Sequence, residues 1–154
     1  MKELKVDAIK DGTVIDHIPA GKALKIIEIL GISENDQLMI GTHLSSKKYG
    51  KKDIIKVENR EFSQHELNLV ALIAPSATFV TICNFGSVKK SQVELPAKIE
   101  RLIKCPNPTC ITNNEIMVTK FLVESKSPIA IRCSYCERVY RIDDISKFII
   151  PLQV

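Results

Sequence analysis

The first sixty residues of the chain alternate between short apolar runs typical of strands and one segment with helical spacing. Residues 6–9 and 13–18 are apolar or alternating runs, separated by an Asp-Gly pair that predicts a turn or a kink within one strand. Residues 20–30 place their apolar side chains at helical spacing, and Gly31 is a natural stop for that helix. The pattern predicts a strand followed by a helix.

The same alternation continues as far as residue 95. A strand pair, a second helix and two further strands are predicted over residues 38–44, 53–57, 63–74, 78–84 and 87–95. Ser63 and Glu66 form a capping-box pattern at the start of this second helix. The order strand, helix, two strands, helix, strands predicts a split βαβ sheet with both helices on one face.

The last third of the sequence reads as a smaller, strand-rich module. Pro96 begins a linker, and the segments that follow are a helical crossing, two hairpin strands, a short strand and a closing helix, over residues 97–103, 116–123, 129–132, 139–141 and 143–148. The prediction is therefore an α+β chain of two domains, residues 1–97 and 98–154.

Four of the five cysteines lie in this second domain as two short loops, Cys105–Cys110 and Cys133–Cys136. Two such knuckles provide the four soft ligands of a tetrahedral zinc site. Buried structural thiols or a redox Cys-x-x-Cys are the alternative, but a redox pair has no need of a second knuckle. A closed four-thiolate site leaves no position for water, so one structural Zn²⁺ per chain is predicted. Cys83 lies in an apolar run and is predicted to be a small core residue.

Composition and charge narrow the function classes. The 154 residues are 45% hydrophobic and 26% charged, as in an ordinary globular protein. The net charge of +4 divides into +1 for residues 1–100 and +3 for the rest, and zinc-bound thiolates lower the latter to about +1. Nucleic-acid binders usually show a stronger basic surface and more aromatic side chains that stack on bases, but here only 5% of residues are aromatic and Trp is absent. A zinc ribbon that binds nucleic acid is therefore only the second hypothesis. The absence of an apolar segment of about 18 residues argues against a membrane span, and the lack of a signal-peptide pattern predicts a cytoplasmic chain.

Enzyme chemistry is not visible in the sequence. His43 and His65 are predicted to be surface or packing residues, and the third hypothesis, an enzyme with a closed zinc site, lacks a base and an open metal position. Asp16 and His17 stand at a strand end, where a carboxylate can bind ribose and a histidine can bind phosphate. If neighbouring strands bring Lys56 and Lys90 to them, the four groups can meet one nucleotide. The alternative is that these lysines decorate a solvated face, as we expect of the lysine-rich loop 47–52.

Five strings of the sequence together resemble the regulatory chain of aspartate carbamoyltransferase. They are Gly12–Ala20, Lys52–Asn59, Ala74–Thr78, Cys105–Ile111 and Cys133–Glu137. The resemblance covers nearly the whole chain in the right order and spacing. It implies a ferredoxin-like allosteric domain followed by a small all-β, zinc-ribbon-like domain with a terminal helix, and no catalytic activity in this chain.

The resemblance also implies partners and effectors. Regulatory chains of this family form homodimers that bridge catalytic trimers, and the zinc domain contacts the catalytic chain. CTP and ATP, with UTP as a further candidate, compete for the allosteric domain and give feedback control of pyrimidine biosynthesis; neither nucleic acid nor a membrane is implied as a partner. Whether each nucleotide inhibits or activates is left open.

Site residues follow from the same resemblance. The nucleotide site maps onto Ala8, Ile9, Val14, Asp16, His17, Lys56, Ile82 and Lys90, and the contact with the catalytic chain onto Asn107, Tyr135 and Glu137. Lys90 and His17 would face phosphate, Asp16 the ribose, and Lys56 the base and sugar, while backbone groups near Ala8 and Ile9 would read the base edge. Departures from the family pattern are Val80 and Phe85, which replace polar residues near the base, and Thr109, which replaces an asparagine.

Overall fold

The computed structural model describes residues 8–33, 35–47 and 50–151. It divides into two compact units, one up to Glu94 and one from Leu95 onward. Among the residues that it describes, no helix is long and apolar enough to cross a membrane.

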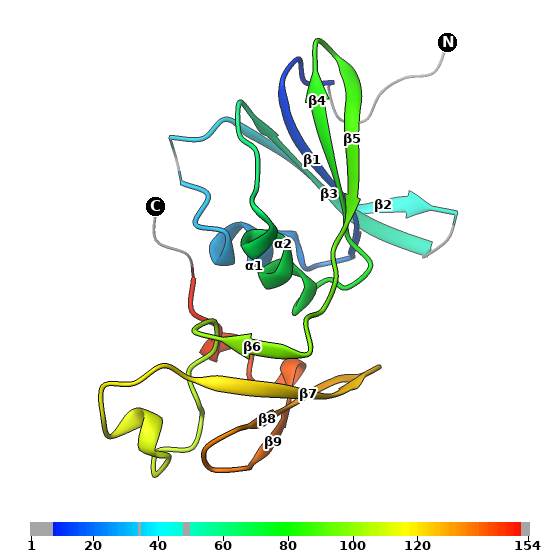
Figure 1. The fold of residues 1–154 in the computed structure, drawn as a ribbon. Helices are drawn as coiled ribbons and strands as arrows, with labels where there is room; N and C mark the ends of the chain where they lie inside the picture. The colour runs from blue at the N-terminus through cyan, green and yellow to red at the C-terminus, as the bar shows by residue number, and fades with distance from the viewer. Residues whose placement is uncertain (1–7, 34, 48–49, 152–154) are drawn as a thin grey trace. The chain divides into compact units, whose positions relative to one another are not determined.

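The first unit is a five-stranded antiparallel sheet with two helices on one face (Figure 1). Its elements are β1 (Gly12–Pro19), α1 (Ala23–Ile29), β2 (Leu38–Ser46), β3 (Gly50–Glu58), α2 (Gln64–Ala71), β4 (Thr78–Cys83) and β5 (Gly86–Gln92). The strand order β2-β3-β1-β4-β5 places β1 in the centre. Two β-α-β connections with β2 and β3 joined directly are the ferredoxin-like arrangement, to which β5 adds an edge strand.

The core of this unit lies between the sheet and the helices. Along β3, Asp53, Ile55 and Val57 are buried while the residues between them are half-buried, as the period of two in a strand requires. Ile15 of β1 pairs with Ile55 and with Phe79 of β4, and all three side chains are buried. The opposite face of the sheet therefore carries the alternate residues of the same strands.

Helix α2 begins as its sequence predicts. The Ser63 side chain accepts a hydrogen bond from the Glu66 N–H, and the Glu66 carboxylate accepts one from the Ser63 N–H. This reciprocal capping box satisfies two backbone donors that a helix start otherwise leaves without partners. Helix α1 begins at Ala23 rather than at residue 20 and has no side-chain cap of its own.

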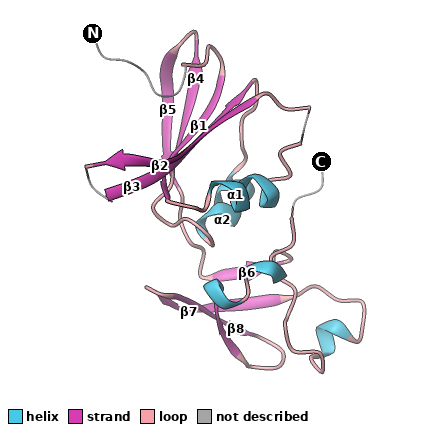
Figure 2. Ribbon diagram, turned by 180° about the vertical axis from the view of Figure 1, so that it is seen from behind, coloured by secondary structure: helices cyan, strands magenta, loops and turns pink. Residues whose placement is uncertain are grey.

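The second unit is a four-stranded antiparallel sheet of order β6-β7-β8-β9 with short 3₁₀ turns (Figure 2). Its strands are β6 (Lys98–Glu100), β7 (Lys120–Lys126), β8 (Ile129–Cys133) and β9 (Val139–Arg141), and its 3₁₀ helices are η1 (Ile111–Asn113), η2 (Ile142–Asp144) and η3 (Ser146–Phe148). Phe121 and Ile131 are fully buried in its core. The α+β fold class, with a strand-rich cysteine-containing second unit, is confirmed.

Three segments of this unit have structures that differ from those predicted from the sequence. The prediction of a helical crossing over residues 97–103 is wrong, because Lys98–Glu100 forms strand β6, in which Ile99 is buried between two exposed neighbours. The strand predicted over 116–123 begins only at Lys120, and Ile116 is fully exposed. The closing segment 143–148 is helical, but as the two 3₁₀ turns η2 and η3 rather than one helix.

Two predictions in the first unit also need correction. Cys83 is exposed at the end of β4 and is not a core residue, because it lies next to the hairpin turn Asn84–Phe85 beyond the cover of the helices. Of the strand predicted over residues 6–9, residues 6 and 7 lie outside the described residues, and Ala8 and Ile9 are not in a strand.

Candidate functional site

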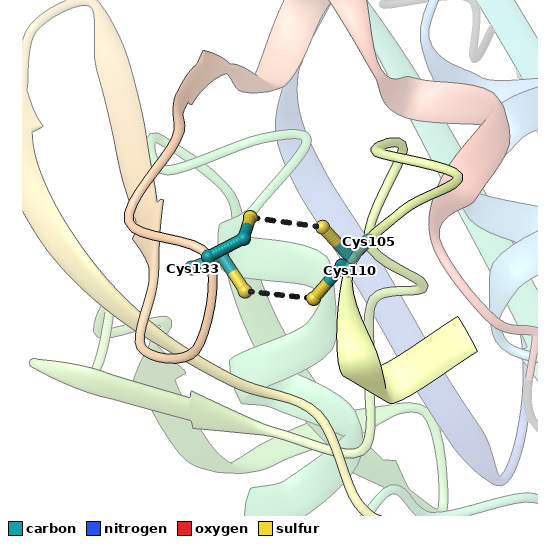
Figure 3. Close-up of side chains that lie close together, drawn as sticks. Cys105, Cys110 and Cys133 are labelled. Atoms are coloured by element: carbon teal, nitrogen blue, oxygen red, sulfur yellow. Dashed lines mark hydrogen bonds between the residues drawn. The ribbon is translucent and has the colours of Figure 1, made fainter. Parts of the chain in front are cut away.

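The two cysteine knuckles form one compact cluster of four sulfur atoms. Cys105 and Cys110 lie in the loop before η1, Cys133 is the last residue of β8, and Cys136 lies in the turn between β8 and β9. The ligand atoms of all four lie within 4.8 Å of one another. The Cys105 and Cys136 sulfurs are 3.7 Å apart and those of Cys110 and Cys133 are 3.8 Å apart. Figure 3 shows the side chains of Cys105, Cys110 and Cys133 directed into this cluster.

This geometry fits zinc. In a tetrahedron with Zn–S bonds of about 2.3 Å, neighbouring sulfurs are about 3.8 Å apart. Three of the cysteines, Cys105, Cys110 and Cys133, are buried and Cys136 is partly buried, and a zinc ion held by all four has no open position for water. A closed set of four thiolates is typical of structural zinc. The four cysteines could therefore hold one zinc ion, as the sequence predicts.

Hydrogen-bond donors surround the sulfurs. The Cys110 sulfur lies 3.2 Å from the Thr112 hydroxyl. Burial raises the pKa of Cys105 to about 12, against a backbone hydrogen bond from Asn107. Burial likewise raises the pKa of Cys133, although the N–H groups of Cys136 and Tyr135 donate to it. Such donors orient the ligands and share the charge of the bound thiolates.

The surroundings of Cys136 make its thiol more acidic than usual. Burial alone would raise its pKa, but hydrogen bonds from the Arg138 N–H and the Asn107 side chain, together with the neighbouring thiols, lower it to about 7. The Asn107 amide is held in place by its own oxygen, which accepts from the Thr109 N–H at 3.1 Å and from the Thr109 hydroxyl at 2.9 Å. Cys136 therefore offers a thiolate near neutral pH, where a metal ion can first bind.

We expect zinc retention to fall steeply on acidification. Cys105 and Cys133, whose pKa values burial raises, must both lose a proton when zinc binds, so the affinity rises with pH and falls as protons compete. These two protons alone lower the apparent affinity by about four orders of magnitude between pH 8 and pH 6, and protonation of Cys136, with a pKa of about 7, adds to the loss. Competition with a chromophoric zinc chelator across this range measures it. An affinity that does not change with pH would contradict a thiolate site.

A second candidate site lies on the helix-free face of the first sheet. Val14 of β1 pairs with Lys56 of β3 on one side and with Val80 of β4 on the other, and Val80 pairs with Lys90 of β5. Residues directly opposite one another in an antiparallel sheet share a face. Lys56, Val14, Val80 and Lys90 therefore form one row across four strands, which we call the effector row. Three strand spacings make it about 14 Å long.

A bulge in β1 sets the direction of Asp16 and His17 beside this row. The register shifts between Ile15 and Ile18, so β1 has two residues where β3 has one, and His17 has a left-handed backbone with φ of 57°. The Asp16 carboxylate lies 2.8 Å from the Lys52 ammonium and accepts from the His17 N–H. Bulges beside binding sites re-aim side chains in this way.

The pKa of Asp16 reflects these contacts. Burial would raise it, but the hydrogen bond from Lys52 and the one from the His17 N–H outweigh burial and hold the pKa below its usual range. The carboxylate is therefore charged at neutral pH. Its contribution to stability is present above the ordinary aspartate pKa and is lost as the pH falls through the lowered value.

His17 is held by Ser76 in the loop before β4 and by Thr78, the first residue of β4. Its Nδ1 lies 3.0 Å from the Thr78 hydroxyl, and its backbone oxygen accepts a hydrogen bond from Ser76. These contacts leave the ring at the edge of a hollow of about 530 Å³ that Lys51 and Ser76 also line. Asp16 and His17 thus stand next to the effector row, at the position where β1 changes register.

The remaining residues of the predicted nucleotide site are placed as follows. Ile82 lies opposite Gly12, two residues along β4 from Val80 and on the same face. Ala8 is exposed, and the Ile9 side chain is buried, so Ile9 can offer only its backbone to a ligand. Gly12 has φ of 139°, and a Cβ there would meet the Val57 carbonyl oxygen at 2.1 Å, so only glycine allows β1 to begin here.

Sequence reasoning missed two polar partners of this site. Lys52 was predicted to belong to a charged loop, but it is the ion-pair partner of Asp16. Thr78 is the first residue of a strand, as predicted, and its hydroxyl also lies 3.0 Å from His17 Nδ1, a contact that the sequence pattern does not show. The alternation of β3 was the available signal for Lys52, since Lys52 and Lys56 are four residues apart on one face.

The residues predicted to contact a catalytic chain differ in exposure. Tyr135 and Glu137 are exposed on the second knuckle, while Asn107 is 6% exposed and its side chain bonds within the metal centre. The exposed apolar side chains of Ile111 and Ile116 lie on the chain around the first knuckle.

Comparison with known proteins gives matches over nearly the whole chain. Residues 4–94 match the family model described as aspartate carbamoyltransferase regulatory chain, allosteric domain, and residues 97–146 match that of the metal binding domain of the same chain. The chain is 53% identical over 148 residues to the aspartate carbamoyltransferase regulatory chain of Pyrococcus horikoshii, covering 94% of this chain and 97% of the relative. It is 47% identical to that of Thermococcus kodakarensis, with 95% and 97% covered, and 45% identical to that of Sulfolobus acidocaldarius, with 90% and 86% covered.

Proposed function

The chain belongs to the family of aspartate carbamoyltransferase regulatory chains, and on this premise we propose that its first unit binds CTP and ATP, with UTP as a further candidate, at the effector row. The chain is a non-catalytic regulatory subunit with an allosteric and a metal-binding domain, and its family associates with catalytic chains in pyrimidine biosynthesis. The finer proposal concerns which residues bind which part of the effector.

The register of the sheet is the observation that carries this proposal. It aligns Lys56 and Lys90 at the two ends of a row about 14 Å long, with the apolar Val14 and Val80 between them. An extended nucleoside triphosphate has a similar length, a flat base that packs on apolar side chains, and a charged end. Lys90 can neutralise phosphate as a mobile point charge.

The bulge residues complete the proposed site. Asp16 is charged and partly exposed, so its carboxylate can accept hydrogen bonds from ribose hydroxyls. His17 would face the phosphates, and Lys56 the base and sugar. Backbone groups of Ala8 and Ile9, with Ile82 on the same face, would border the base.

Val80 lies in the middle of the effector row and so bears on the choice of base. It has no polar atom, and Phe85 at the tip of the β4–β5 hairpin is 66% exposed. With no side-chain donor or acceptor at position 80, only the backbone groups of Ala8 and Ile9 would read the base edge, which weakens the discrimination between cytosine and adenine. We therefore propose that CTP and ATP bind with closer affinities than a polar residue at position 80 would give.

The variant Lys90→Ala tests the effector row. Loss of one charge-assisted hydrogen bond to phosphate costs about 1.5 to 3 kcal/mol, which corresponds to a dissociation constant about 12 to 150 times larger. Titration calorimetry of CTP and of ATP into the zinc-loaded chain measures this change.

Lys89→Ala is the matched control. Lys89 is the preceding residue of β5, pairs with Thr81 and points to the other face of the sheet. The two variants remove the same charge from the same strand, so a general loss of positive charge affects both equally. Equal affinities of Lys90→Ala and the unchanged chain would remove Lys90 from the site.

The proposed division of the chain places the nucleotide-binding domain at residues 1–97 and the zinc domain, with the contact to the catalytic chain, at residues 98–154. Tyr135 and Glu137 are exposed and suit a direct contact, and Asn107 would act from within the knuckle. We also propose that two regulatory chains form a homodimer. A zinc site of free thiolates needs a reducing compartment, which supports a cytoplasmic location.

A further inference from the structure

Thr112 places a buried hydroxyl group beside the metal centre. It is the second residue of η1, and only 9% of it is exposed. Its hydroxyl oxygen lies 3.2 Å from the Cys110 sulfur, within hydrogen-bond reach, and this contact is buried. Because buried polar groups in folded proteins are almost always hydrogen-bonded, a contact of this kind calls for a reason.

The segment that carries Thr112 is tied to the first knuckle by hydrogen bonds. The side-chain amide of Asn113 donates to the Cys105 oxygen at 2.8 Å. The Cys110 oxygen accepts from the Asn113 N–H at 3.0 Å and from the Asn114 side chain at 2.9 Å. These bonds fix η1 against both cysteines of the first knuckle, so the Thr112 hydroxyl is held close to the Cys110 sulfur.

Zinc binding decides which of the two atoms donates. Without a metal, the Thr112 hydroxyl and the Cys110 thiol each carry a proton, so either can be the donor. A cysteine that coordinates zinc loses its proton. The sulfur is then an acceptor only, and the hydrogen bond must run from the Thr112 hydroxyl to the sulfur. A bond to a charged acceptor is also about twice as strong as a bond between neutral groups.

The charge of the zinc-loaded centre favours such a donor. Four thiolates and one Zn²⁺ carry a net charge of about −2, which hydrogen-bond donors of the protein must share inside a dry site. Cys110 is 2% exposed, so water contributes little to the solvation of its sulfur. The Thr112 hydroxyl is a neutral donor that is already in place.

We propose that Thr112 is a positioning residue of the metal centre, whose hydroxyl donates to the zinc-bound Cys110 thiolate. The hydrogen bond fixes the direction of the sulfur and lowers its tendency to take up a proton or to leave the metal. The proposal rests on the metal centre and not on the effector row, so either can fail without the other.

Two variants that differ by one oxygen atom test this role in the full chain. Thr112→Ser keeps the hydroxyl group, and Thr112→Ala removes it. Relative to Thr112→Ser, the zinc affinity of Thr112→Ala should fall about 10- to 100-fold in competition with a chromophoric chelator, the usual loss for a partner of a metal ligand. Thr112→Val fills the space that water could enter in Thr112→Ala, and it should show the same loss.

The cobalt(II)-substituted chain gives a second readout, which reports on the sulfur itself. In Thr112→Ala and Thr112→Val, the sulfur-to-cobalt charge-transfer bands should move to lower energy, because a sulfur without its hydrogen bond gives up electrons more easily. In Thr112→Ser the bands should stay at the energy of the unchanged chain.

Thr119→Ala is the matched control for the loss of a buried hydroxyl. Thr119 lies in the same unit and is also 9% exposed, but its hydroxyl donates to the Ile103 oxygen at 2.6 Å. The control can lower the stability of the unit and, through folding, its zinc affinity. It should leave the cobalt bands at their original energy.

Two outcomes would overturn the proposal. One is that Thr112→Ala and Thr112→Val have the zinc affinity and the cobalt spectrum of Thr112→Ser. The other is that they lose zinc affinity while the cobalt bands do not move, as expected of Thr119→Ala. Thr112 would then support the fold of the first knuckle without acting on the sulfur.

Discussion

Removal of zinc from the intact chain is expected to unfold the unit from Leu95 onward while the unit up to Glu94 keeps its native fold. The second unit has 60 residues, a size at which apolar burial alone gives marginal stability. Zinc binding supplies on the order of 10 kcal/mol of apparent folding free energy in modules of this kind. The four cysteines also join the segment before η1 to the β8–β9 turn, so their release separates the two halves of the unit.

Hydrogen exchange followed by mass spectrometry measures this outcome in the full chain before and after treatment with a strong chelator. Peptides that contain Phe121 and Ile131, which are fully buried in the second unit, should lose protection. Peptides that contain Ile15 and Ile55, which form the core of the first sheet, should keep it. The first unit has no cysteine of the cluster, so the metal does not enter its stability.

A pair of cysteine variants distinguishes the effect of losing the metal from the effect of losing a thiol group. Cys105→Ser removes one ligand and should reproduce the chelated state, whereas Cys83→Ser removes an exposed thiol outside the cluster and should leave exchange unchanged. The expectation would be contradicted if the second unit kept full protection from exchange in a sample that elemental analysis shows to be free of zinc. Loss of protection in both units together would show that they fold as one.

The sequence predicted best those features that depend on local pattern. The metal ligands follow from the spacing of two knuckles, and the Ser63–Glu66 capping box is present as expected. Strand β6 was mistaken for a helix because three residues around Ile99 are too few for a period to be recognised. Cys83 was mistaken for a core residue because apolar neighbours in sequence do not show where a strand leaves the cover of its helices.

Features that depend on pairing between strands needed the structure. The alignment of Lys56 with Lys90 through Val14 and Val80 depends on registers that no single strand contains. The bulge at Asp16 and His17 is likewise a property of two strands with unequal numbers of residues.

Asp53 is the clearest case of a residue whose importance lies in tertiary contacts. Its carboxylate is fully buried in β3 and accepts three backbone hydrogen bonds, from Gly21 at 2.9 Å, Ala23 at 3.1 Å and His43 at 2.9 Å. The second satisfies the N–H of the first residue of α1, a helix whose N-cap Lys22 makes no side-chain hydrogen bond, and the first fixes the residue just before that N-cap. The third holds the bulge of β2, where His43 has φ of 55°. One carboxylate therefore joins β3, α1 and β2.

We expect Asp53→Ala to destabilise the first unit by about 3 to 5 kcal/mol. The substitution leaves three backbone N–H groups without their acceptor in or near the core, and each such group costs about 1 to 3 kcal/mol, less whatever water recovers. Asp53→Asn keeps one carbonyl oxygen and the volume of the side chain, so it should cost about half as much. Urea unfolding of the zinc-loaded chain, followed through peptides of the first unit by hydrogen exchange, gives both values.

Glu94→Ala serves as the control, because Glu94 is an exposed carboxylate of the same unit with no hydrogen bond or ion pair among the described residues. It should change the free energy of unfolding by less than about 0.5 kcal/mol. The residue before Asp53 is Lys52, the partner of Asp16, so a loosened β3 should also weaken nucleotide binding in Asp53→Ala. If Asp53→Ala were as stable as the unchanged chain, water would have to replace the carboxylate at all three N–H groups. Apolar packing alone would then hold α1 in its position.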